Sequence, residues 1–113
     1  MRSAPKSGPA KFPIMYQLEI TNLAKGDLRE ATYYYEEIGF GTGGRFLGQY
    51  RDVLLKIQDR PHSLRFKTGQ IRFSRLKTFP FLVFFRVDDA RQVATVFAIL
   101  HEKRHPDSWK KRV

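Results

Sequence analysis

Near the end of the chain, four residues with distinct chemistry follow one another closely: His101, Arg104, Pro106 and Trp109. The imidazole of His101 can exchange a proton near neutral pH, and the guanidinium of Arg104 suits a phosphate or a carboxylate. A proton-transfer group beside a fixed positive charge could cleave a phosphodiester. Because Pro106 excludes a helix through this turn and Trp109 is large and apolar, we predict that both act as a structural latch for the last segment.

His101 also has a structural interpretation, which we favour. It follows residues 93–100, an apolar and β-branched run typical of a buried strand, so it stands at a strand exit. A histidine there is more often a core residue satisfied by the backbone than a catalytic group. His105 lies four residues further on, but Pro106 breaks the helix on which that spacing would converge on a metal. We therefore expect no metal and no cofactor.

Positive charge is concentrated in the second half of the chain. From Arg60 to the end there are 13 Lys and Arg against four Asp and Glu, whereas residues 15–59 carry five against seven. Such an asymmetry attracts RNA, DNA or an acidic protein surface. We predict that cations on and after neighbouring strands cluster on one face, although Arg86 could equally pair with Asp88 or Asp107. The predicted target- or RNA-binding residues are Arg72, Arg75, Lys77, Arg86, Lys103, Arg104, Lys110, Lys111 and Arg112.

The spacing of apolar residues predicts the helices and strands that position these residues. Apolar positions recur every three to four residues over 24–38 and again over 46–57, which predicts two helices, the second with Thr42 as its N-cap. From Gln70 the period becomes two, which predicts strands over 71–74, 81–87 and 92–101. Residues 88–91 form the tight connection between the last two strands.

With a first strand over 16–21, the predicted fold is α+β in the order β-α-α-β-β-β. Its helical hairpin packs on one face of a mostly antiparallel four-stranded sheet. The 113 residues, with no cysteine, suit one domain over 15–113, preceded by a flexible basic tail over 1–14. The sequence contains no run typical of a membrane span or a secretory signal, so we expect a cytoplasmic protein without a membrane partner.

In their order along the chain, several segments resemble the RelE/ParE superfamily of bacterial toxins, and ParE-like members in particular. The C-terminal order His, Arg, Pro, Trp resembles the superfamily signature after its last strand. Further segments similar to the family's strands and helices are Tyr16–Thr21, Asp27–Ala31 with Tyr34 and Tyr35, Arg45–Leu47, Phe79–Phe81 and Phe84–Arg86. The resemblance implies the toxin of a type II toxin–antitoxin, or plasmid stabilisation, system, held in a hetero-oligomer by a cognate acidic antitoxin.

The resemblance leaves two targets open. A RelE-like toxin is a ribosome-dependent mRNA endoribonuclease, or mRNA interferase, and His101 and Arg104 would then be catalytic. A ParE-like toxin is a non-catalytic inhibitor of DNA gyrase. We favour gyrase inhibition, because Trp109 and a basic tail replace the Tyr or His that such ribonucleases often place near the C-terminus, and the second and third predicted strands carry no carboxylate base. A plain nucleic-acid-binding module would explain the charge but not the C-terminal signature.

Overall fold

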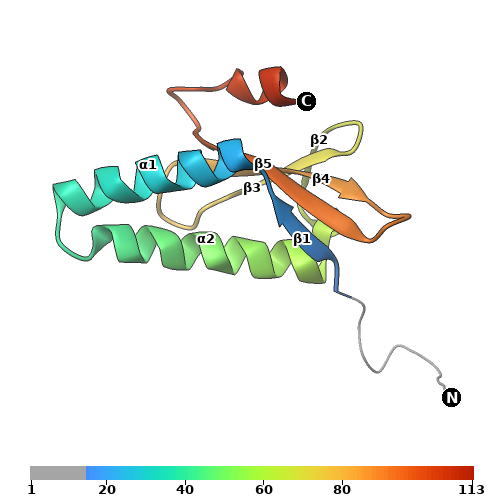
Figure 1. Ribbon diagram of the computed structural model, residues 1–113, viewed down its shortest axis with the longest axis horizontal. Helices are drawn as coiled ribbons and strands as arrows, with labels where there is room; N and C mark the ends of the chain where they lie inside the picture. The colour runs from blue at the N-terminus through green and yellow to red at the C-terminus, as the bar shows by residue number, and fades with distance from the viewer. Residues whose placement is uncertain (1–14) are drawn as a thin grey trace, which may run out of the picture.

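The computed structural model describes residues 15–113, which form two long helices and a five-stranded sheet (Figure 1). In chain order the elements are β1 Gln17–Ile20, α1 Asn22–Ile38, α2 Thr42–Asp59, the 3₁₀ helix η1 Pro61–Ser63, β2 Arg65–Thr68, β3 Ile71–Arg75, β4 Phe81–Asp88, β5 Val93–His101 and the 3₁₀ helix η2 Ser108–Arg112. The predicted flexible tail, residues 1–14, lies outside the described residues. Within residues 15–113, no helix combines the length and apolar character needed to cross a bilayer.

The strand order in the sheet is β1-β5-β4-β3-β2. β1 pairs in parallel with β5, and every other neighbouring pair is antiparallel. This arrangement confirms the predicted α+β class and the mostly antiparallel sheet. The prediction of four strands is wrong, because β2 adds a fifth strand beside β3. All four residues of β2 are exposed, so its sequence has no apolar alternation, and the turn through Gly69, with φ of 56°, brings it onto β3.

The turn between α1 and α2 differs from the predicted one. Thr42 is not the N-cap but the first helical residue, and the cap is Gly41 in the left-handed conformation, with φ of 86°. The carboxylate of Glu36, from the last turn of α1, accepts the N–H groups of Gly41 and Gly43 at 3.0–3.1 Å. This negative charge at the N-terminus of α2 replaces a hydroxyl cap. A Cβ on Gly43 would lie 2.8 Å from the carbonyl oxygen of Thr32, so glycine permits the close packing of the two helices.

The sheet is apolar on both faces. One face packs against the helical hairpin, where α2 contributes Phe46, Tyr50, Val53 and Ile57 to the larger core. The second face carries a separate cluster of buried side chains, namely Ile71, Phe84, Phe97, Ala98, Leu100 and Trp109. Because the helices cover only the first face, the second must be covered by another part of the chain.

Residues 102–113, here termed the C-terminal strap, fold back over the sheet on the side away from α2 (Figure 1). Trp109 is the central apolar anchor of the strap. It is 5% exposed, and its ring stacks on Phe84 with 5.7 Å between ring centroids and an interplanar angle of 16°. The strap therefore completes the second core.

A partly buried ion pair fixes the other end of the strap. Arg112 donates to both carboxylate oxygens of Asp27 on α1, at 2.6 and 3.1 Å, and to the carbonyl oxygen of Phe97 at 3.1 Å. Asp27 also accepts the N–H of Ile99 at 2.9 Å. The Arg112 and Asp27 side chains are 18% and 13% exposed, so both charges are largely removed from water and depend on each other. This pair connects α1, β5 and the strap.

We expect Trp109→Ala to lower the free energy of unfolding by about 3 kcal/mol, because it removes a buried aromatic ring and leaves a cavity over Phe84. Guanidinium chloride unfolding measures this value. Lys111→Ala, an exposed change in the same helix, is the control and should alter stability by less than about 0.5 kcal/mol. A Trp109→Ala protein as stable as the parent would contradict the strap as a core element.

The buried ion pair predicts strong coupling between its two residues. Asp27→Ala and Arg112→Ala should each lower the free energy of unfolding by about 3 kcal/mol, because each leaves a partly buried charge without its partner. The double variant should cost less than the sum of the two, with a coupling energy of about 2 kcal/mol in a double-mutant cycle. Additive losses would mean that the two side chains act independently.

Candidate functional site

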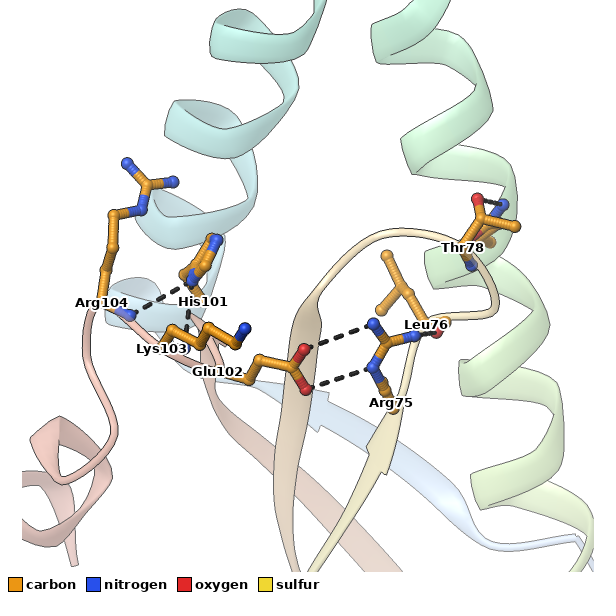
Figure 2. Close-up of polar contacts among 8 residues, drawn as sticks. Arg75, Leu76, Thr78, His101, Glu102, Lys103 and Arg104 are labelled. Atoms are coloured by element: carbon orange, nitrogen blue, oxygen red, sulfur yellow. Dashed lines mark hydrogen bonds and ion pairs between the residues drawn. The ribbon is translucent and has the colours of Figure 1, made fainter.

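The candidate site lies where β5 ends and the strap begins (Figure 2). Antiparallel pairing places His101, the last residue of β5, opposite Phe81, the first residue of β4. Pairing of β3 with β4 puts Arg75 opposite Leu82, so the end of β3 lies at the same edge. The sheet register therefore brings His101 and Arg75 to one end of the molecule, together with residues 102–104.

The imidazole of His101 is a structural acceptor in this geometry. Its Nδ1 accepts the backbone N–H groups of Lys103 at 3.1 Å and Arg104 at 3.2 Å, as Figure 2 shows. Its ring meets Phe81 edge-on, with 5.3 Å between centroids. Two donors on Nδ1 require the neutral tautomer with its proton on Nε2. Burial lowers the pKa of His101, and the charge of Arg104 lowers that pKa further.

Arg104 points from the strap toward α1. Its guanidinium carbon lies 5.5 Å from the centre of the Tyr34 ring, a cation–π contact. Within residues 15–113 it has no ion-pair partner within 4.0 Å. The neighbouring cleft of about 400 Å³ is lined by both helical and strap residues, among them Glu30, Tyr34, His101, Arg104, His105 and Ser108. This cleft is the place where an anion could meet Arg104.

Arg75 is committed to an internal ion pair. Its Nε and one terminal nitrogen donate to the two carboxylate oxygens of Glu102, at 3.1 and 3.3 Å (Figure 2). Its remaining terminal nitrogen donates to the carbonyl oxygen of Leu76 at 3.1 Å. The hydrogen bond from Arg75 lowers the pKa of Glu102, so this carboxylate is a weak base. The pair joins β3 to the start of the strap.

The predicted cluster of strand cations on one face is wrong for Arg72. Successive residues of β3 point to opposite faces, so Arg72 lies on the helix side, whereas Arg75 and Arg86 lie on the other. Arg72 donates to the carbonyl oxygens of His62 at 3.2 Å and Leu64 at 2.8 Å, which holds η1 against β3. Its guanidinium is therefore used within the protein.

The remaining predicted cations lie in different surroundings. Arg86 pairs with neither Asp88 nor Asp107, and its guanidinium carbon lies 5.2 Å from the centre of the Phe97 ring. Lys77 is exposed in the connection between β3 and β4, near α2. Lys103 and Lys111 are exposed, Lys110 lies 3.4 Å from Asp107, and Arg112 is in the buried pair with Asp27. The structure therefore separates surface cations from those that hold the fold.

Sequence reasoning missed three residues that shape the charged surfaces. The sequence pattern places Asp27 in a helix but does not indicate its ion pair, because its partner Arg112 is distant in sequence. Arg65 and Lys67 lie in β2, the unpredicted strand, and both are exposed. The local signal for β2 is a single apolar residue, Phe66, between the two cations, which is too short to establish a strand period. Within the described residues, no three His, Asp or Glu side chains come together as metal ligands do.

The chain is similar to known proteins in its family and its fold. The model of the family described as ParE toxin of type II toxin–antitoxin system, parDE, matches residues 18–106. No curated protein matches the sequence.

Solved toxin structures share this fold. The chromosomal ParDE system from P. aeruginosa matches with a TM-score of 0.64 and 20% identity, covering 77% of this chain and 96% of that one. The intact E. coli RelBE toxin–antitoxin complex matches with a TM-score of 0.59 and 15% identity, covering 79% and 99%. The isolated E. coli RelE toxin matches with a TM-score of 0.55 and 13% identity, covering 87% and 99%.

Two substitutions of His101 separate an acceptor role from a proton-transfer role. His101→Asn can place its carbonyl oxygen near the Nδ1 position and keep the two backbone hydrogen bonds, whereas His101→Gln reaches the Nε2 position and loses them. We expect Asn to retain most of the stability and Gln to lose about 1 kcal/mol in chemical unfolding, since the N–H groups of Lys103 and Arg104 lose their acceptor within the protein. Equal stability of the two variants would contradict the acceptor role.

The same histidine predicts acid sensitivity. The pKa of His101 is lower in the folded protein than its ordinary value of 6.5, so below that pH the unfolded state takes up the proton more readily. The stability that neutral His101 contributes is complete above about pH 6.5 and is lost as the pH falls toward the folded-state pKa. Melting temperatures between pH 7.5 and 5 should therefore fall less in His101→Asn than in the parent.

Proposed function

Because the chain belongs to the ParE toxin family of type II toxin–antitoxin systems, we propose that it acts by inhibiting DNA gyrase and not by cutting mRNA. On this proposal the toxin binds its target without making or breaking a covalent bond in RNA. Binding energy and surface complementarity then determine activity, and no residue needs to transfer a proton.

The state of His101 is the observation that carries this proposal. Among the predicted catalytic residues, it is the one side chain able to transfer a proton near neutral pH. Its Nδ1 is occupied by the N–H groups of Lys103 and Arg104, so it cannot accept a substrate proton without breaking the turn. Its Nε2 carries the proton of the neutral ring and is not a base. A 2′-hydroxyl would therefore meet no available base on this imidazole.

The neighbouring ion pair supports the same proposal. Glu102 is the nearest carboxylate in sequence, but both of its oxygens accept from Arg75. This hydrogen bonding also removes the guanidinium fork of Arg75 from any role in holding a phosphate. The two groups that could complement His101 in catalysis serve instead to join β3 to the strap.

A ribosome-dependent ribonuclease is the second candidate, and one observation favours it. Arg104 has no carboxylate partner among the described residues and lies at a cleft of about 400 Å³ that also contains His105. A guanidinium in that position could stabilise charge that develops on a cleaved phosphate. The fold does not separate the two candidates, since both ParDE and RelBE structures match it.

The proposed partner of the toxin is an acidic cognate antitoxin that binds it in a hetero-oligomer. The solved structures that share the fold include toxin–antitoxin complexes. On this chain, a groove between α1 and α2 of about 1030 Å³ is predominantly apolar, and Leu23 and Tyr33 on its edge are 60% and 69% exposed. An antitoxin segment that is partly disordered when free could place apolar side chains there and carboxylates beside Arg104, the cation of the basic half that faces α1.

Purified toxin should be assayed in parallel for gyrase supercoiling with trapped cleavage complexes and for mRNA cutting on ribosomes. We expect inhibition of gyrase, no RNA products, and nearly full inhibition by His101→Asn, because no proton transfer is involved. His101→Asn controls for the turn, since it keeps the acceptor that His101→Gln loses. RNA cleavage by the parent protein that falls about 100-fold or more in a folded His101→Asn variant would overturn the proposal in favour of the ribonuclease.

A further inference from the structure

A group of four cations lies on the second face of the sheet, away from the helical hairpin. Arg65 and Lys67 come from β2, Arg86 from β4 and Lys110 from η2. Sheet pairing aligns Arg65 with Phe73, and Phe73 with Phe84, so they share one face. We refer to these four cations and the rings beneath them as the cation–aromatic face. The group is distinct from Arg104, which faces α1 from the start of the strap.

Each of the four cations lies over an aromatic ring. The Arg65 guanidinium carbon is 5.5 Å from the centre of Phe73, and Lys67 Nζ is 5.9 Å from the same ring. The Trp109 ring has Lys67 Nζ at 5.4 Å and Lys110 Nζ at 6.0 Å. Arg86 lies over Phe97, with the distance given above. Ring contacts restrict these long side chains, so their charges are held in place before any ligand binds.

The aromatic rings themselves are largely inaccessible to a ligand. Phe97 is 1% exposed and Trp109 is 5% exposed, while Phe73 is half-buried beneath two cations. A single-stranded nucleic acid needs open aromatic faces on which its bases can stack, and a protein partner needs an apolar anchor site. The cation–aromatic face provides neither. What it presents to solvent is fixed positive charge.

This charge is largely uncompensated. Among residues 15–113, no carboxylate lies within 4.0 Å of Arg65, Lys67 or Arg86. Lys110 has Asp107 at 3.4 Å, but the two side chains are 62% and 76% exposed, where an ion pair is weak and exchangeable. Arg91, in the turn between β4 and β5, differs in being paired with Glu19 and Asp88. The face therefore favours a ligand with closely spaced negative charges.

We propose that the cation–aromatic face binds the phosphate backbone of duplex DNA. Duplex phosphates are closely spaced and outward-facing, and their recognition requires cations without base stacking. The inference rests on the proposed function in its choice of duplex DNA, since gyrase holds a DNA duplex. The toxin would then contact both gyrase and the DNA on which gyrase acts.

The test is binding of the full-length chain to a fluorescein-labelled duplex of arbitrary sequence, measured by anisotropy over a range of KCl concentrations. The test variant is the double substitution Arg65→Gln and Lys67→Gln. The matched control is Arg51→Gln and Lys56→Gln, which removes the same charge from exposed positions on α2. Thermal melting establishes that both variants are folded.

We expect the test variant to lose duplex affinity. The negative slope of log K against log salt should also become shallower by about 1.8, because each of the two lost phosphate contacts contributes about 0.9. The control should leave the slope unchanged. Equal losses in both variants would overturn the proposal, because they would show a general effect of charge. Tighter binding to single-stranded than to duplex DNA would also overturn it, as would displacement of the duplex by polyglutamate at an equal concentration of charge, which would indicate an acidic protein.

Gyrase inhibition by the same variants separates this inference from the proposed function. If the parent inhibits gyrase but the test and control variants bind DNA equally, the cation–aromatic face is not a DNA-binding surface and the proposal of gyrase inhibition is supported. If the parent does not inhibit gyrase but the variants differ in DNA binding as expected, the proposed function is wrong and DNA binding by the cation–aromatic face is supported.

Discussion

The structure depends on covering the second apolar face of the sheet. Two helices bury the first face, and within the described residues 15–113 the segment 102–113 covers the second. A short segment with little regular structure gains little from backbone hydrogen bonding, so its position must come from side-chain anchors. Trp109 supplies the apolar anchor, and the Arg112–Asp27 pair supplies a directional one that also contacts β5. Partial burial of that pair is tolerated because one carboxylate oxygen also accepts from Ile99 and one guanidinium nitrogen also donates to Phe97.

This constraint explains why residues with catalytic potential have structural contacts here. The strap must leave β5 through a sharp turn, and the Nδ1 of His101 accepts the two N–H groups that the turn exposes. Arg75 and Glu102 then tie the first residue of the strap back to β3. The residue types that suit phosphodiester chemistry are thus also those that suit a compact strand exit. Their hydrogen-bond partners distinguish the two uses.

The strap also divides the positive charge of the protein into two surfaces. On one side, Arg104 faces α1 across a cleft, and on the other, Arg65, Lys67, Arg86 and Lys110 lie over the rings of the second core. Cations inside the fold, such as Arg72, add to net charge but not to a binding surface. The two surfaces are formed by different residues, so a ligand on one need not contact the other. Net charge alone would not separate these surfaces.

The features that can be predicted from the sequence are those encoded by local hydrophobic period and by residue type. Helical spacing located α1 and α2, alternation located β3, β4 and β5, and the order of these elements led to the α+β class and the toxin family. β2 was not predicted because a fully exposed edge strand has no buried face, and its sequence therefore lacks a run of alternating apolar residues. The cap of α2 was not predicted because the capping carboxylate, Glu36, belongs to the preceding helix.

The role of each charged residue depends on contacts that form when distant parts of the chain come together. Arg72 and Arg75 are three residues apart on one strand, yet the pleat sends them to opposite faces, one toward carbonyl oxygens and the other toward Glu102. Asp27 and Arg112 meet only because the strap crosses β5 to reach α1. The sequence shows that a residue is a cation. Register and chain crossing, which are properties of the whole fold, decide whether that cation is available to a partner.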